Sequence, residues 1–265
     1  MKYLLFLLVF LFSSHAKASS SAAIESALNL YAKHGTLDIP TPSKEVVAAL
    51  QRGDVIHIPT YATQSDVPGG VLVMLLINQP RPKVWIANQD GHLAKTKEVT
   101  EFLVATPKPH THQWYGIVDF PFPFTDRHWV VESTTNAKLS VITQNQIWER
   151  RWMLTKPALP VARQIIADNP QHSVTLKDFD SAIVTPTNEG IWLFIRLSET
   201  ETLLGYFVTS EIGGYIPVAA FTAWARHTTA SMLQNNAKRA ARVEEHYTQG
   251  HRLMYGGDNK IIPHW

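Results

Sequence analysis

The final third of the sequence contains a long amphipathic segment that constrains the fold of everything before it. From Tyr215 to about Tyr247 the apolar residues recur with helical spacing, and Pro217 suits the first turn, where its missing N–H costs no hydrogen bond. About thirty helical residues extend roughly 45 Å, so this helix can bury its apolar face only against a broad, concave partner. That apolar face comprises Val218, Phe221, Trp224, Ala225, Thr228, Met232 and Ala237.

The residues before this helix alternate apolar and polar side chains with a period of two, which is typical of β-strands. Strands are predicted over 55–62, 70–77, 97–105, 112–120, 128–136, 139–148, 179–184, 190–197 and 202–210. Short helices are predicted over 21–33, 44–52 (with Ser43 as N-cap), 80–88 and 157–168. The sequence therefore predicts one α+β domain, in which a curved antiparallel sheet of about eight or nine strands wraps around the long C-terminal helix. The volume between them is either filled by side chains or left as a ligand cavity.

The composition excludes several classes of protein. With 45% hydrophobic residues the chain is not disordered, and 24 Lys and Arg against 22 acidic residues give no field that would attract nucleic acid. There is no cysteine, which excludes thiol catalysis, thiolate metal sites and disulfides. The 8 Trp, 8 Tyr and 11 Phe residues indicate a large apolar interior or pocket.

The first eighteen residues have the pattern of a secretory signal peptide. A short basic start precedes the apolar run 4–12, and Ala16 and Ala18 occupy the small-residue positions of a cleavage site. The apolar run would rise only about 14 Å as a helix, well short of the roughly 30 Å hydrocarbon core, although an uncleaved anchor remains an alternative. Cleavage after Ala18 removes Lys2 and Lys17 and no acidic residue, which leaves 22 basic and 22 acidic residues. We therefore expect a periplasmic or secreted protein.

Three segments resemble motifs of the steroidogenic-acute-regulatory-related lipid-transfer (START) family, within the helix-grip superfamily. Residues 120–130 (FPFPFTDRHWV) are similar to the family's P-F-P-x-x-D-R-D-x-V signature at the start of a central strand. Residues 211–217 (EIGGYIP) resemble its D-x-G-G-W-I-P approach to the final helix, and residues 80–88 resemble its P-x-x-V-W element. The resemblance covers roughly 55–242 and includes the final helix itself.

The resemblance implies a helix-grip fold in which these motif residues act mainly as architecture. Prolines cannot donate ladder hydrogen bonds, an adjacent Asp–Arg pair can lock a turn, and paired glycines allow a sharp turn. The residues concerned are Pro121, Pro123, Asp126, Arg127, Gly213, Gly214 and Pro217. The chain departs from the family pattern at His128, Glu211 and Tyr215, and residues 155–176 look like an insertion.

The resemblance also implies a function, namely non-enzymatic binding, and transfer, of a lipid or other apolar molecule outside the cytoplasm. Related helix-grip proteins include polyketide cyclases, so an enzyme acting on a hydrophobic substrate in the same cavity is the main alternative. An interaction module with a filled cavity is a second alternative. The predicted organisation is a signal peptide (1–18), a helical segment (19–54), a START-like lipid-binding domain (55–247) and a C-terminal tail (248–265).

The candidate ligand contacts come from the final helix and from strands whose faces the sequence cannot orient. Along 190–197, Trp192, Phe194 and Arg196 share one face, and an inward Arg196 would need a partner or a polar ligand head. Glu132 is its expected inward counterpart, with a solvated Arg196 as the alternative. The full predicted set is Trp114, Glu132, Trp192, Phe194, Arg196, Tyr206, Phe221, Trp224, Thr228 and Met232.

No catalytic, metal or cofactor motif emerges from the sequence. His110 and His112 could form a two-ligand fragment, but no third ligand or H-E-x-x-H pattern accompanies them. The basic residues Lys238, Arg239 and Arg242 are expected to form a solvated helix end, with a transient contact to an anionic lipid surface as a minor alternative. We therefore predict no metal, no cofactor and no nucleic-acid partner, and the oligomeric state stays open.

Overall fold

The computed structural model describes residues 20–62, 70–90, 99–108, 110–171, 173–211, 213–214 and 218–265, and for 60–62 and 218–221 it describes the backbone alone. The predicted signal peptide, Tyr215 and Pro217 lie outside the described residues, as does the side chain of Phe221. In the described part of the chain, no helix is long and apolar enough to cross a membrane.

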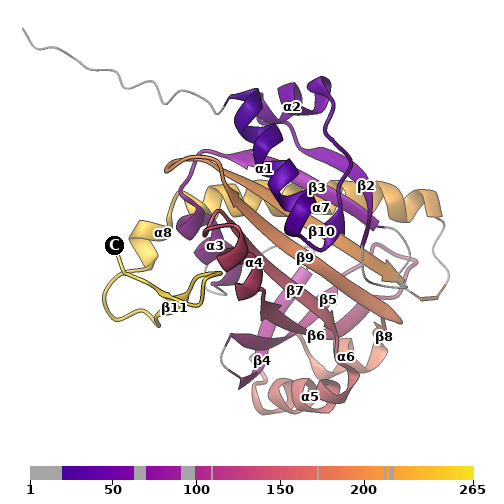
Figure 1. Ribbon diagram of the computed structural model, residues 1–265. Helices are drawn as coiled ribbons and strands as arrows, with labels where there is room; N and C mark the ends of the chain where they lie inside the picture. Colours follow the sequence, from indigo (N-terminus) through magenta and orange to yellow (C-terminus); the bar gives the residue numbers. More distant parts are fainter. Residues whose placement is uncertain are drawn as a thin grey trace, which may run out of the picture.

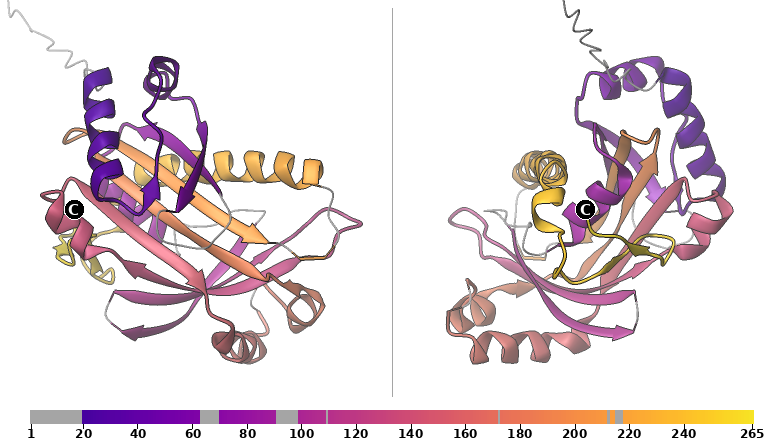
Figure 2. Two further views of the ribbon diagram at one scale, coloured as in Figure 1. Left: turned by 45° about the vertical axis from the view of Figure 1, so that its right-hand side comes forward. Right: turned by 90° about the vertical axis from the view of Figure 1, so that its left-hand side faces the viewer.

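One large, strongly curved sheet forms the body of the protein (Figures 1 and 2). All neighbours along its main path are antiparallel, and β8 (Ile183–Val184) pairs in parallel with β6 beside that path. The early strand β3 lies beside the late strand β10, so distant parts of the sequence meet in mid-sheet. The order is β1 (Leu37–Asp38), β2 (Ile56–Ala62), β3 (Gly70–Ile77), β10 (Thr202–Glu211), β9 (Thr187–Arg196), β7 (Ile147–Leu154), β6 (Arg127–Thr135), β5 (Thr111–Val118) and β4 (Val99–Lys108).

The helices cover both faces of this sheet. On the concave side lie the long helix α7 (Val218–Ala240) and α3 (Arg81–Gln89), which pack against each other (Figure 2). On the outer side, α1 (Ser21–His34), α2 (Lys44–Gln51) and α4 (Ala137–Ile142) contribute to one core. A 3-10 turn (Lys156–Ala158), α5 (Leu159–Asp168) and α6 (Leu176–Ser181) lie on the outer face near β4 to β6. The predicted α+β architecture, with a curved antiparallel sheet and a long C-terminal helix, is confirmed.

The alternation of side chains along β9 separates two cores, because successive strand residues point to opposite faces. Leu193 and Ile195 pack on the outer side with Leu28 of α1. Phe194 packs on the concave side with Trp85 of α3, at a ring distance of 4.9 Å. Both faces of the central strands are therefore buried, which is why the sequence alone could not orient them.

Two predicted strands are partly helical in the structure. Residues 139–148 were expected to form a strand, but Asn136 caps α4 by accepting a hydrogen bond from Leu139 N at 3.2 Å, and β7 begins only at Ile147. Residues 179–184 were also expected to be a strand, but Thr175 and Asp178 form a capping box that starts α6. In both places the apolar run is short enough to suit a helix or a strand, and a capping side chain next to it stabilises the helix.

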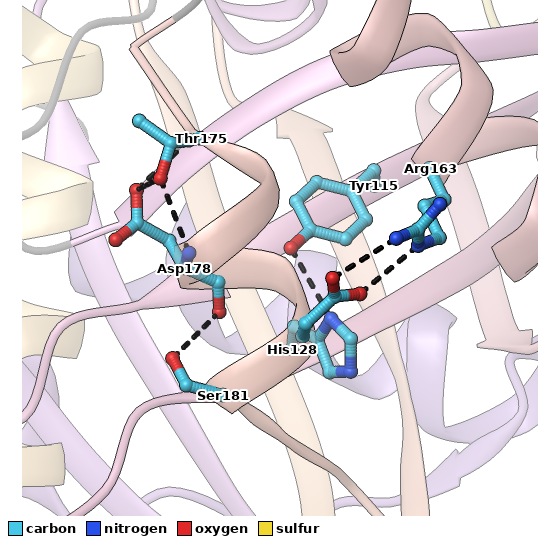
Figure 3. A network of polar contacts seen from close by, with 7 residues as sticks. Tyr115, His128, Arg163, Thr175, Asp178 and Ser181 are labelled. Atoms are coloured by element: carbon cyan, nitrogen blue, oxygen red, sulfur yellow. Dashed lines mark hydrogen bonds and ion pairs between the residues drawn. The ribbon is translucent and has the colours of Figure 1, made fainter.

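The predicted insertion 155–176 supplies most of the cover over the outer face of β5 and β6. Figure 3 shows this region, where Tyr115 Oη and His128 Nδ1 form a 3.2 Å hydrogen bond and Arg163 binds Asp180 through two contacts of 2.9 Å. His128 also packs on Phe179 of α6, with the ring centres 4.6 Å apart. Burial lowers the pKa of His128, so a neutral ring occupies the position where the START motif has an aspartate.

The C-terminal segment predicted as a tail folds back onto the domain. Helix α8 (Val243–His246) follows α7, and strands β11 (Met254–Tyr255) and β12 (Ile261–Ile262) form a hairpin beside α3 (Figure 1). Trp85 Nε1 donates to Tyr255 O at 2.8 Å, and Gly256 and Gly257 lie against the ring of Trp148. A side chain on Gly257 would meet that ring at 2.3 Å, which explains the pair of glycines.

Candidate ligand-binding cavity

A cavity lies between α7 and the concave face of the sheet. The compartment next to α7 has a volume of about 120 Å³, and Met232 and Arg239 of α7 form its helical wall. The opposite wall comes from the inward residues of five strands. These wall residues are Val99, Glu101, Trp129, Val131, Trp152, Asn188, Trp192 and Tyr206, together with Asn88 of α3.

Two further compartments continue this cavity toward the C-terminal hairpin. A central one of about 90 Å³ shares Val131, Trp152 and Trp192 with the first. An end compartment of about 230 Å³ shares Trp114 and Arg150 with the central one. The hollow therefore runs along the concave face from α7 to the hairpin.

Aromatic rings form the middle of the cavity wall. The ring of Tyr206 stacks on Trp152 at 5.4 Å and lies 4.5 Å from Trp192. Trp152 Nε1 donates to Asn188 Oδ1 at 3.2 Å, so the polar edge of this indole is satisfied while its ring remains on the wall. Such a surface favours apolar ligand groups, because the rings offer a large apolar contact area.

Charged groups occupy both ends of the cavity. Near α7, Glu101 is accessible to solvent yet surrounded by protein, and desolvation raises its pKa although Arg239 opposes the shift. Burial likewise raises the pKa of Tyr206, which keeps its hydroxyl protonated. At the other end, Arg150 is only 4% exposed, and desolvation lowers its pKa to about 10.

No family model and no curated protein matches this sequence. Among solved structures, human STARD10 superposes with a TM-score of 0.54 at 9% identity, covering 82% of this chain and 79% of that one. Human StAR-related lipid transfer protein 5 superposes with a TM-score of 0.51 at 10% identity, covering 84% of this chain and 98% of that one. The chain has the START-like helix-grip fold. At these identities the likeness concerns the fold alone.

The START-like motif residues hold two loops together. Asp126 Oδ1 accepts from Phe120 N at 3.1 Å, and the buried Arg127 donates to Thr125 O and, at 2.7 Å, to Gly213 O. Arg127 thus joins the turn before β6 to the turn before α7. Gly213 and Gly214 have positive φ angles of 62° and 65°, and a side chain on Gly214 would meet Arg127 Nη2 at 2.7 Å.

Four of the predicted ligand contacts line the cavity of this START-like fold, namely Trp114, Trp192, Tyr206 and Met232. Phe194 points to the concave side but lies fully buried in the core. Trp224 packs on Phe120 with a ring distance of 4.6 Å, and Thr228 is buried on α7. Neither of these two is part of the wall of the three compartments. Whether the lining residues touch a ligand remains a prediction.

The predicted charged pair of the cavity is not where the sequence analysis placed it. Arg196 is on the concave side, but it lies at the end of β9 with its side chain 40% exposed, and it pairs with Glu199 at 3.4 Å. Glu132 lies on the outer face, where it accepts a hydrogen bond from Gln113 Nε2 at 3.0 Å and lines an outer pocket. The expectation that Glu132 points inward is therefore wrong, because β6 turns its odd-numbered residues to the cavity.

The basic end of α7 is only partly solvated. Lys238 and Arg242 are exposed, as expected, but Arg239 lines the cavity and burial lowers its pKa. His110 and His112 both line the end compartment. Within the described residues no group of three or more potential metal ligands is assembled.

Sequence reasoning missed the residues that distinguish this cavity, chiefly Glu101, Arg150 and Trp152. Arg150 stands in a run of three charged residues on β7, a pattern typical of a solvated segment. The available signal was the alternation of Trp148, Arg150 and Trp152, which places a cation among aromatic residues on one face.

Proposed function

We propose that this protein binds a lipid or another apolar small molecule in the cavity between the sheet and α7, without converting it chemically. The observation that carries the proposal is the aromatic wall formed by Trp114, Trp152, Trp192 and Tyr206. One of the two similar structures is, by its name, a lipid transfer protein, which agrees with the proposal.

Binding would be driven by burial of the apolar part of the ligand. Each methylene group moved from water into such a cavity contributes about 0.8 kcal/mol. Ligand pockets usually measure about 300–1,000 Å³, whereas the compartments here measure about 120, 90 and 230 Å³. A ligand with a long tail therefore needs all the compartments in series, and movement of α7 or a neighbouring loop would widen them for its entry.

An enzyme of the polyketide cyclase type remains the alternative, and Glu101 is the group that would favour it. It is the one carboxylate among the described residues that line the three compartments, and its pKa is raised, as a general base requires. However, the raised pKa of Tyr206 makes that hydroxyl a poor proton donor. Simple binding accounts for the cavity with fewer requirements, and so we favour it.

Native mass spectrometry tests the proposed function. We expect protein purified from an exporting host to retain an apolar molecule and, once stripped, to take up 1-decanol. Val131→Trp should abolish both the retention of that molecule and the uptake of 1-decanol, because Val131 lines two of the compartments and the indole ring would fill them. Val161→Trp is the matched control, since Val161 is 49% exposed on α5. A folded wild-type protein that binds nothing, or equal uptake by both variants, would refute the proposal, and turnover without retention would support the enzyme.

We further propose that the protein works in the periplasm or outside the cell and carries its ligand between sites there. The apolar run 4–12 with Ala16 and Ala18 supports export, and the absence of cysteine suits an oxidising compartment without depending on disulfides. The intact mass of protein recovered outside the cytoplasm should correspond to a chain that begins at Ser19. Recovery of the full-length chain from the membrane fraction would contradict export by cleavage.

A further inference from the structure

The end compartment of the cavity, between β5, β7 and the C-terminal hairpin, differs in charge from the rest. Two arginines, Arg150 and Arg252, line this space of about 230 Å³, together with His110 and His112. The described residues that line it include no aspartate or glutamate. Among the described lining residues, two guanidinium groups without a carboxylate give this partly open space a positive potential that favours anions.

Arg150 is the central group of this compartment and has no acidic partner in the described part of the chain. Its Nε donates to Ser133 Oγ at 2.5 Å, and its Nη1 donates to Gln89 Oε1. Its Nη2 donates to His112 Nδ1 at 2.5 Å and approaches Ser133 O at 3.4 Å. These neutral acceptors satisfy hydrogen bonds but not the charge, and at most four of the five N–H donors of a guanidinium are used. A buried cation without a counter-charge is costly, so such an arrangement points to an anion supplied from outside the chain.

The neighbouring groups leave the compartment open to such an anion. Because Arg150 can only donate, His112 must accept the hydrogen bond at Nδ1. The proton of the neutral His112 ring is then on Nε2, which is a further hydrogen-bond donor. Asp90 follows the lining residue Gln89 in the sequence, but its carboxyl group already pairs with His251 Nε2 at 2.9 Å. Arg252 is exposed at the mouth, where it can meet a charged group as it enters.

We propose that this compartment binds the anionic headgroup of the apolar ligand, a carboxylate or a phosphate, with Arg150 as its principal partner. The ligand tail then lies along the aromatic wall past Trp114 toward Trp152 and Trp192, in the adjoining compartment. A guanidinium binds carboxylate and phosphate oxygens through paired, charge-assisted hydrogen bonds, which gives both affinity and orientation. The inference rests on the proposed binding function and assigns the ligand class.

Three probes with the same tail test this assignment on the full-length mature protein. Binding of decanoate, decyl phosphate and 1-decanol is measured by titration of the tryptophan fluorescence and by calorimetry. We expect decanoate or decyl phosphate to bind at least about tenfold more tightly than 1-decanol, the range expected for hydrogen bonds to a charged group. The comparison of decanoate with decyl phosphate distinguishes a carboxylate from a phosphate headgroup.

Variants of three arginines connect the preference to this compartment. Arg150→Gln should weaken binding of the anionic probe at least about tenfold more than binding of 1-decanol, which removes the preference for the anion. Arg252→Gln, at an exposed position, should reduce the preference more weakly and carries little risk to folding. Arg196→Gln is the control, because Arg196 is 40% exposed and pairs with Glu199. Thermal unfolding shows whether each variant is folded. If Arg150→Gln does not fold, the headgroup preference of Arg252→Gln decides whether the compartment binds the anion.

The outcomes separate the two proposals. Equal affinity of the wild type for all three probes would overturn the anionic headgroup site and leave the binding function standing. A preference that survives in both Arg150→Gln and Arg252→Gln would overturn it as well. Failure of every probe to bind would instead reject the binding function.

Discussion

At the scale of single residues, we expect His112 to make the stability of the fold depend on pH. Burial, with the nearby cations Arg150 and Arg252, lowers the pKa of His112 from 6.5 to about 4. A histidine with a lowered folded-state pKa binds its proton more readily in the unfolded chain, so stability is lost as the pH falls from about 6.5 to 4. The shift sets an upper bound of about 3 kcal/mol on this loss. His112→Asn keeps an acceptor near Arg150 but does not titrate. We therefore expect this variant to lose less free energy of unfolding than the wild type as the pH falls over that range.

Urea denaturation at pH 7 and pH 4.5 measures this difference. The lowered pKa of His128 acts in the same direction in both proteins and therefore cancels from the comparison. His227→Asn, at an exposed position on α7, should behave like the wild type. If wild type and His112→Asn lose equal stability between the two pH values, His112 is not neutral in the folded protein at pH 4.5.

The residues that set these properties were hard to predict for a definite physical reason. Glu149 and Arg150 are adjacent on β7 and point to opposite faces, and both are buried because the sheet is covered on both sides. Charged residues in a strand normally indicate a solvated face. Trp192 was a candidate because it shares a face with Phe194 and Arg196, although the sequence could not orient that face. The burial of Arg150 depends on helix α3 and the hairpin, which come from distant parts of the chain.

At the scale of secondary-structure elements, α1 is bonded to β7 on the outer face through one buried carboxyl group. Glu149 has 0% exposure, and Tyr31 Oη of α1 donates to its Oε2 at 2.7 Å. Thr36 Oγ1 and Asn136 Nδ2 also donate to the carboxyl group of Glu149, at 3.1 and 2.8 Å. Tyr31→Phe leaves this group short of one donor, and we expect it to lower the free energy of unfolding by roughly 1–3 kcal/mol.

Urea denaturation at neutral pH tests the role of this bond. Tyr255→Phe provides the matched control, because Tyr255 is 47% exposed, and it should change stability by less than about 0.5 kcal/mol. Equal losses in the two variants would show that the packing of α1 relies on its apolar residues and not on the Tyr31–Glu149 bond.

Elements with strong periodicity could be predicted, and those decided by caps could not. The strands at 70–77 and 202–210 were predicted nearly at their observed bounds, because their runs are long and bordered by turn residues. Residues 139–148 contain a short apolar run that suits either helix or strand, and Asn136 decides for helix by capping α4. The hairpin at the C-terminus has strands of only two residues, too short to show a period.

At the scale of the whole molecule, the order of elements and three motifs were sufficient to predict the START-like fold, but not how tightly α7 closes the cavity. In the part of the chain that the structure describes, Thr228 Oγ1 and both polar side-chain atoms of Asn236 are buried on α7 without a hydrogen-bond partner. Each such group typically costs about 1–3 kcal/mol. Helix α7 therefore packs less favourably than its length suggests, and we expect it to open more readily than the central strands.

Hydrogen exchange and one substitution test α7 as the gate. Amide hydrogens of α7 should exchange faster than those of β9 and β10, and bound 1-decanol should slow exchange in α7 selectively. Asn236→Leu replaces the unpaired amide with an apolar side chain of similar size, so it should stabilise the packed helix by about 1 kcal/mol or more and slow ligand release several-fold. Gln234→Leu, at an exposed position on the same helix, should change neither quantity. If Asn236→Leu is more stable but releases 1-decanol at the wild-type rate, the ligand leaves by another route, and α7 is a fixed wall of the cavity.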